Sequence, residues 1–103
     1  MQTIKFPIAV ILHKHGEMVY FSQLDLIHIL ERALRRSDLP LYFTQGFNPH
    51  VKISFKNGLK LGQEGFIEVI FYFTENIVFC RLKEILQPQL PEGLEIIDKE
   101  VSG

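Results

Sequence analysis

Six apolar segments follow one another along the chain in the order strand, helix, strand, strand, helix, strand. Four of them are rich in β-branched and aromatic residues or alternate apolar with polar positions, as strands do. The other two repeat apolar residues every three or four positions, which is typical of an amphipathic helix. The predicted strands are residues 4–13, 51–55, 66–73 and 94–98, and the predicted helices begin at Ser22 and at Asn76.

The first helix has the clearest local signals. Ser22 followed three residues later by Asp25 is a capping-box pattern, with Asp in place of Glu. Glu31 and Arg35 have the spacing of an ion pair on a helix surface, and Pro40 lies just beyond the predicted end. The apolar stripe predicted to face the core consists of Leu24, Ile27, Leu30, Ala33 and Leu34.

The second helix is predicted over residues 76–87. Asn76 is the expected N-cap and Pro88 the expected stop. Cys80 lies in this segment beside apolar neighbours, so we expect a buried, unreactive thiol. The predicted apolar stripe is Val78, Leu82, Ile85 and Leu86.

This order of elements predicts an α+β fold of βαββαβ type, the ferredoxin-like sandwich, in which an antiparallel sheet carries two helices on one face. The core face of residues 66–73 should be Ile67, Val69, Phe71 and Phe73. The opposite face of the sheet is then left open, and a partner, a second domain, RNA or a second copy of the chain could cover it. The residues predicted on that face are Lys52, Ser54, Lys56, Phe66, Glu68, Ile70 and Tyr72.

Length and composition fit a single domain over residues 1–103, with 47% hydrophobic residues for one core. The net charge of −1 does not by itself predict a nucleic-acid binder, so any such case depends on how charges are distributed. The N-terminus lacks the features of a signal peptide, and no apolar run approaches the roughly 18 residues of a membrane span. With a single cysteine in addition, we expect a cytoplasmic protein with no membrane partner.

None of the usual patterns for a metal, cofactor or catalytic site is present. His13 and His15 are two residues apart, His28 and His50 are distant, and no Cys or acidic residue stands at ligand spacing beside them. Asp25 is explained by helix capping, and no nucleophile has an oriented base. We therefore predict no metal, no cofactor and no catalytic residue, and we do not expect a self-sufficient enzyme.

The segment 43–50, Phe-Thr-Gln-Gly-Phe-Asn-Pro-His, is richer in functional side chains than a turn requires. Aromatic residues interleaved with amides and cations suit stacking and edge contacts to single-stranded RNA. The alternative is a loop packed by its own Phe residues with its amides bonded to backbone, and the residues alone leave both open. The candidate binding residues are Gln45, Phe47, Asn48, His50 and Lys52, with Arg32, Arg35 and Arg36 as secondary phosphate contacts.

Residues 21–26 (FSQLDL), 31–40 (ERALRRSDLP), 44–50 (TQGFNPH) and 90–96 (LPEGLEI), with Ser54-Phe55 and Leu61-Gly62, carry a resemblance in order and spacing. Together they resemble the bacterial radical-SAM-linked domain family of unknown function (DUF2344-like), over most of the chain. The Gln-Gly-Phe-Asn-Pro segment is the most specific part. Gln23 departs from the family, which usually has His there. The family's domain usually continues beyond residues 90–96, so we expect this chain to match its N-terminal part.

The resemblance implies an accessory or substrate-presenting domain whose partner is a radical-SAM protein. Because radical-SAM proteins often act on RNA or protein, it also implies tRNA or rRNA as the presented substrate. Two alternatives remain from the residues. One is an RNA-processing enzyme of ferredoxin-like type, with His28 or His50 as general acid or base. The other is a purely structural protein-interaction domain that self-associates through the open sheet face.

Overall fold

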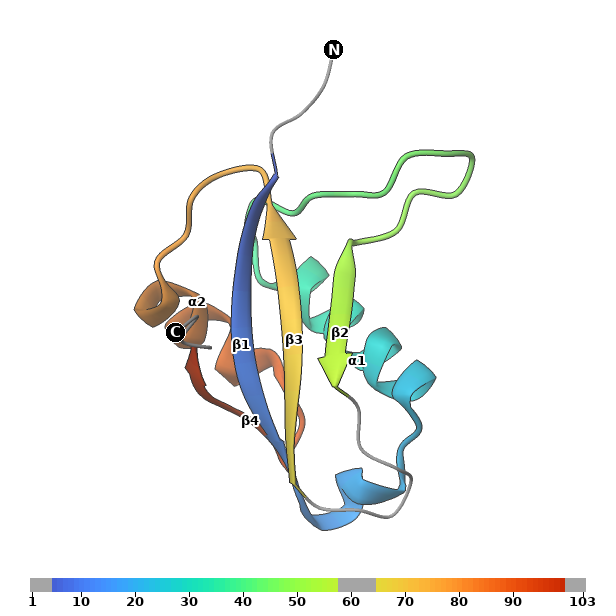
Figure 1. The fold of residues 1–103 in the computed structure, drawn as a ribbon, viewed down its shortest axis with the longest axis vertical. Helices are drawn as coiled ribbons and strands as arrows, with labels where there is room; N and C mark the ends of the chain where they lie inside the picture. Colours follow the sequence, from blue (N-terminus) through green and yellow to red (C-terminus); the bar gives the residue numbers. More distant parts are fainter. Residues whose placement is uncertain (1–4, 58–64, 100–103) are drawn as a thin grey trace.

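The computed structural model describes residues 5–57 and 65–99. Four strands form one antiparallel sheet in the order β2-β3-β1-β4, and two helices lie on the same side of it (Figure 1). The predicted βαββαβ, ferredoxin-like class is therefore confirmed. The elements are β1 Phe6–Lys14, η1 Gly16–Tyr20, α1 Gln23–Arg36, β2 Ile53–Asn57, β3 Gly65–Phe73, α2 Phe79–Leu86, η2 Gln87–Gln89 and β4 Leu94–Lys99.

The core lies between the sheet and the two helices. The four residues predicted on the core face of β3 are all at most 1% exposed, and Val10 and Leu12 of the paired strand β1 are buried beside them. On the other face of β3, Phe66 is 60% exposed, because none of the helices among the described residues covers that side (Figure 1). The alternation of β3 thus correctly predicted which face is packed and which is open.

Pro7 is tolerated inside β1 because of where β4 pairs. In the described residues, β4 pairs with β1 only from Val10 to Lys14, so the Pro7 end of β1 has β3 as its neighbour on one side. A missing N–H can be accommodated where a strand has an unpaired side.

The capping box of α1 is confirmed, but its apolar stripe is rotated from the predicted one. The Ser22 hydroxyl accepts from the Asp25 N–H at 3.1 Å, and the Asp25 carboxylate accepts from the Ser22 N–H at 3.0 Å. Leu24 was wrongly predicted to face the core and is 61% exposed. At 100° per residue, Leu24 lies well away from the direction shared by the buried residues. Those residues are Leu26, Leu30, Ala33 and Leu34.

The second helix is shorter than predicted. It begins at Phe79 rather than at Asn76, and Val78 occupies the N-cap position without a capping side chain. Ile77 packs against the core and anchors the chain before the helix starts, which leaves Val78 64% exposed rather than in the stripe. Cys80 is exposed, so the prediction of a buried thiol is wrong.

Candidate functional site

The segment that joins α1 to β2 folds back on itself and positions the predicted binding loop. Phe43 and Val51 form an isolated antiparallel bridge, and the Thr44 N–H donates to the His50 carbonyl at 2.8 Å. The His50 N–H in turn donates to the Thr44 hydroxyl at 3.0 Å. These contacts close the base of a loop whose tip extends away from the sheet, in green in Figure 1.

The tip of this loop is open to solvent. Phe47 has a relative exposure of 103%, so nothing packs against its ring, and Gln45 and Asn48 are also exposed. Neither amide side chain forms a hydrogen bond to any residue within 5–57 or 65–99. The alternative in which the loop is packed by its own Phe residues does not describe Phe47. The tip therefore presents an aromatic ring flanked by two amides.

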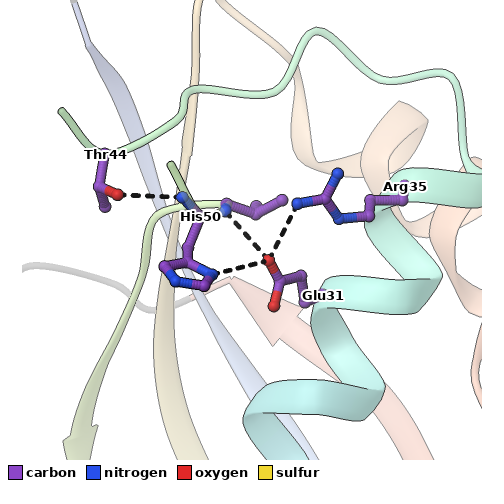
Figure 2. A network of polar contacts seen from close by, with 5 residues as sticks. Glu31, Arg35, Thr44 and His50 are labelled. Atoms are coloured by element: carbon purple, nitrogen blue, oxygen red, sulfur yellow. Dashed lines mark hydrogen bonds and ion pairs between the residues drawn. The ribbon is translucent and has the colours of Figure 1, made fainter. Parts of the chain in front are cut away.

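Glu31 ties the base of the loop to α1. One oxygen of its carboxylate accepts from the Val51 N–H at 3.3 Å and from the Arg35 guanidinium at 3.2 Å. The same oxygen lies 3.8 Å from Nδ1 of His50 (Figure 2). The helix α1, the base of the loop and the backbone just before β2 thus all contact the Glu31 carboxylate.

The ionisation of Glu31 follows from these contacts. Its partial burial by itself would raise the pKa of the carboxyl, because burial disfavours the charged form. The hydrogen bond from the Val51 N–H, the Arg35 guanidinium and the charge of His50 together outweigh that effect and lower the pKa below its usual value of 4.5. Glu31 is therefore a carboxylate at neutral pH and a stable anchor for its neighbours.

A cleft of about 380 Å³ opens beside this anchor and is lined by His28, Glu31, Arg32, Arg35 and His50. Arg35 is held on a second side, because its guanidinium lies 5.3 Å from the centre of the Phe43 ring. Arg32 forms no hydrogen bond or ion pair with any residue that the structure describes. The cleft therefore combines one oriented arginine, one arginine available to a ligand, and two imidazoles.

The structure brings together some of the predicted binding residues and separates others. Arg32, Arg35 and His50 share the cleft, whereas Arg36 points elsewhere and donates to the carbonyl and side-chain oxygens of Gln89 at 2.8 and 3.1 Å. Arg36 therefore has a structural partner that joins α1 to η2. Gln45, Phe47 and Asn48 lie on the loop tip rather than in the cleft.

Lys52 lies near the open face of the sheet, as predicted. Its ammonium is 5.1 Å from the centre of the Tyr72 ring, and Lys5 lies 5.8 Å from the rings of both Tyr42 and Tyr72. The Tyr72 hydroxyl is 3.3 Å from that of Ser54. Two tyrosines and two lysines thus form one cluster. The segment 41–52 runs between this cluster and the cleft, and the Lys52 N–H donates to the Tyr42 carbonyl at 2.9 Å.

Sequence reasoning missed several of these residues. Glu31 was predicted only as half of a surface ion pair, because the backbone of Val51 is 20 positions away. Tyr42 and Lys5 carry no motif. Tyr42 reaches Tyr72 through the fold of the segment 41–52, and Lys5 reaches it through the pairing of β1 with β3. His28 was predicted only as an alternative catalytic residue, and its place three residues before Glu31 is the one signal that could have linked it to the cleft.

These features define a small α+β domain with an open sheet face and a cationic cleft beside an exposed aromatic loop. Residues 8–102 match the family described as an uncharacterised protein conserved in bacteria (DUF2344), and the chain belongs to that family. No curated protein and no solved structure matched the chain. Among the described residues, no helix has the length and apolar character needed to cross a membrane.

Proposed function

We propose that this domain is a non-catalytic binding module that holds a single-stranded segment of RNA, from tRNA or rRNA, and presents it to a radical-SAM protein. The observation that carries the proposal is the position of the exposed Phe47 loop directly beyond a cleft with two arginines. Single-stranded RNA is bound by this combination of cations along the backbone and aromatic rings under the bases.

The cleft supplies the phosphate contacts in this proposal. Arg32 has no partner among the described residues, so binding a phosphate there breaks no existing ion pair. Arg35 is held by Glu31 and Phe43, which orients its guanidinium before the ligand arrives. A preoriented arginine loses less conformational entropy on binding than a mobile one.

The loop and the open sheet face supply the base contacts. The ring of Phe47 is available on both sides for stacking, and Gln45 and Asn48 have free donors and acceptors for base edges. A longer RNA segment would continue over Lys52 and Tyr72, where a ring and a cation already lie together.

The first experiment is fluorescence polarisation of the purified domain with labelled single-stranded RNA and with bulk tRNA at increasing salt. We expect binding that weakens with salt, with a log–log slope of about −0.7 per phosphate contact on a single strand. Phe47→Ala should weaken binding about 5- to 150-fold, the range that follows from about 1–3 kcal/mol for one stacked base. Tyr20→Ala is the matched control, since Tyr20 is 72% exposed on η1.

The phosphate contacts have their own control. Arg32→Ala should lower the steepness of the salt dependence by about one contact. Arg81→Ala removes the same charge from an exposed position on α2 and should leave the slope unchanged. Equal effects of the two substitutions, or no binding at low salt, would refute the RNA proposal.

The radical-SAM partner rests on the family resemblance and needs its own test. We expect the domain to co-purify with a radical-SAM protein of the same organism, and more strongly when RNA is present. Light scattering of the isolated domain over a range of concentrations checks the competing structural role. A mass that doubles with concentration, combined with no RNA binding, would favour self-association through the open sheet face.

One observation favours a second function, an RNA-cleaving enzyme. The cleft holds two imidazoles, His28 and His50, beside a carboxylate and two arginines. Two histidines can serve as general base and general acid while arginines stabilise the charge on the phosphate. RNA cleavage that disappears in both His28→Ala and His50→Ala would establish this function. Intact RNA after long incubation would refute it and leave the non-catalytic binding module as the proposed function.

A further inference from the structure

A second cluster of polar side chains lies outside the cleft, on the open face of the sheet where β1 ends and β4 begins. His13 and His15 alternate along the chain and therefore point to the same side of the sheet. In the β1–β4 pairing, His13 stands directly opposite Glu95, which brings the carboxylate to the same side. Glu95 is 80 positions from His15 in sequence, which is why spacing rules did not associate the two.

The three side chains come close enough to share one ligand. Nε2 of His15 and Oε1 of Glu95 are 2.8 Å apart, and the rings of His13 and His15 are stacked with centroids 4.7 Å apart. One ligand atom from each residue lies within 4.8 Å of the other two. We propose that His13, His15 and Glu95 form a binding site for a divalent transition-metal ion, a role that goes beyond the RNA-binding function proposed above.

The ligand set indicates the kind of ion. Two imidazole nitrogens and one carboxylate oxygen suit Zn²⁺ and neighbouring first-row ions rather than Mg²⁺ or Ca²⁺, which prefer oxygen ligands. Zinc bonds of about 2.0–2.2 Å place tetrahedral ligand atoms about 3.4 Å apart. His15 and Glu95 would therefore move apart by roughly half an ångström, and a side-chain rotation is enough for that.

The surroundings of the cluster favour a cation. An adjoining cleft of about 380 Å³ is lined by His15, Gly16, Glu17, Glu92 and Gly93, so two further carboxylates lie beside the cluster. Their negative potential attracts a divalent ion without their being ligands. The side chains of His15 and Glu95 are 31% and 54% exposed, which leaves the remaining coordination positions to water.

The backbone holds His15 in place before any ion arrives. Its N–H donates to the Gly93 carbonyl at 2.9 Å. The approach is so close that a Cβ on Gly93 would lie 2.6 Å from the His15 carbonyl oxygen, and Gly93 has a φ of +96°. The turn before β4 can therefore approach the end of β1 only because position 93 is glycine, and this contact fixes the distance between His15 and the start of β4.

The test is a titration of the untagged domain with ZnCl₂. It is monitored by calorimetry and by the NMR signals of the histidine ring nitrogens. We expect one ion per domain, with changes at His13 and His15 and none at His28 and His50. The latter two lie on α1 and the loop base and act as internal controls. Zinc that shifts all four histidines equally, or no heat of binding at millimolar zinc, would overturn the proposal.

Substitutions distinguish a metal-binding site from a simple surface hydrogen bond between His15 and Glu95. Glu95→Gln keeps a hydrogen-bond acceptor for His15 but removes the anionic ligand, and it should weaken zinc binding at least about tenfold, as even outer-shell changes commonly do. His15→Ala should do the same, and His28→Ala is the matched control. If His15→Ala does not fold, Glu95→Gln decides the question, because its exposed side chain is not part of the core. An unchanged affinity in Glu95→Gln would refute the site.

Discussion

Replacing Glu31 by Gln tests whether one carboxylate joins the loop to the helix. Gln keeps an oxygen for the Val51 N–H but loses the charge. A hydrogen bond to a charged acceptor contributes about 1.5–3 kcal/mol and a neutral one about 0.5–1.5. At 3.3 Å the bond is long, so we expect a loss of about 0.5–1 kcal/mol there. The Arg35 pair, with Arg35 50% exposed, adds about 0.3–0.5 kcal/mol.

The pH dependence of this loss has a definite sign. Because the pKa of Glu31 is lower in the folded state than its usual 4.5, its contribution to stability is present above pH 4.5. It is lost as the pH falls through the lower folded-state pKa. Urea unfolding at pH 7 should show a midpoint lower by about 0.5–1 M in Glu31→Gln. The difference between the two proteins should become smaller at pH 3.5, because this pH lies below the usual pKa of 4.5 and the unfolded state then gains protons.

The controls separate this anchor from a general effect of charge. Glu84→Gln removes a carboxylate from an exposed position of α2 and should leave the midpoint unchanged at both pH values. Hydrogen exchange of the Val51 amide gives a local measurement, and it should become faster in Glu31→Gln. A midpoint loss that is the same at pH 7 and pH 3.5, with unchanged exchange at Val51, would refute the reasoning.

Three further predictions concern the scaffold. Leu30→Ala should lower the free energy of unfolding by about 2–5 kcal/mol, because Leu30 is completely buried, while Leu24→Ala on the exposed face should change it by less than about 0.5, as urea unfolding would show. Gly93→Ala should cost at least about 1–3 kcal/mol from its positive φ and the contact described above, and a midpoint equal to the native one would contradict this. Cys80 should react with a thiol reagent in the native protein at a rate near that of a free thiol, because it is exposed, and slow reaction that requires urea would show burial.

The fold could be predicted because its signals are local. The alternation along β3 and the capping box at Ser22 are each set by residues within a few positions, and both were confirmed. The phase of α1 was less certain from sequence, since Leu24 and Leu26 are both apolar and only packing against the sheet decides which one is buried. The predicted start of α2 was wrong for a related reason, because Ile77 reaches the core from an extended segment.

Lys14 illustrates what alternation alone cannot decide. It continues the core parity of β1 and is 1% exposed, although a charged residue at the end of a strand is usually in solvent. Its ammonium donates to the Phe21 carbonyl at 3.5 Å, a contact that exists because η1 folds under the end of β1. Burial lowers the pKa of this ammonium. The environment of Lys14 thus depends on η1, a 3-10 helix that lies outside the six segments predicted from sequence.

The candidate site was predicted in its parts but not in its assembly. Loop composition left open whether the Phe residues of the segment 43–50 are packed or exposed, and the structure exposes Phe47. Three arginines close together in sequence also have three different surroundings in the fold. Arg36 is bonded to Gln89, Arg35 is bonded to Glu31, and Arg32 has no partner among the described residues. In the proposed RNA complex, a phosphate would compete with Glu31 for Arg35 but not for Arg32, so Arg32 should supply most of the affinity and Arg35 most of the geometry. Sequence spacing predicted the Glu31–Arg35 pair but not the contact of Arg36, because Gln89 belongs to η2 and is 53 positions away.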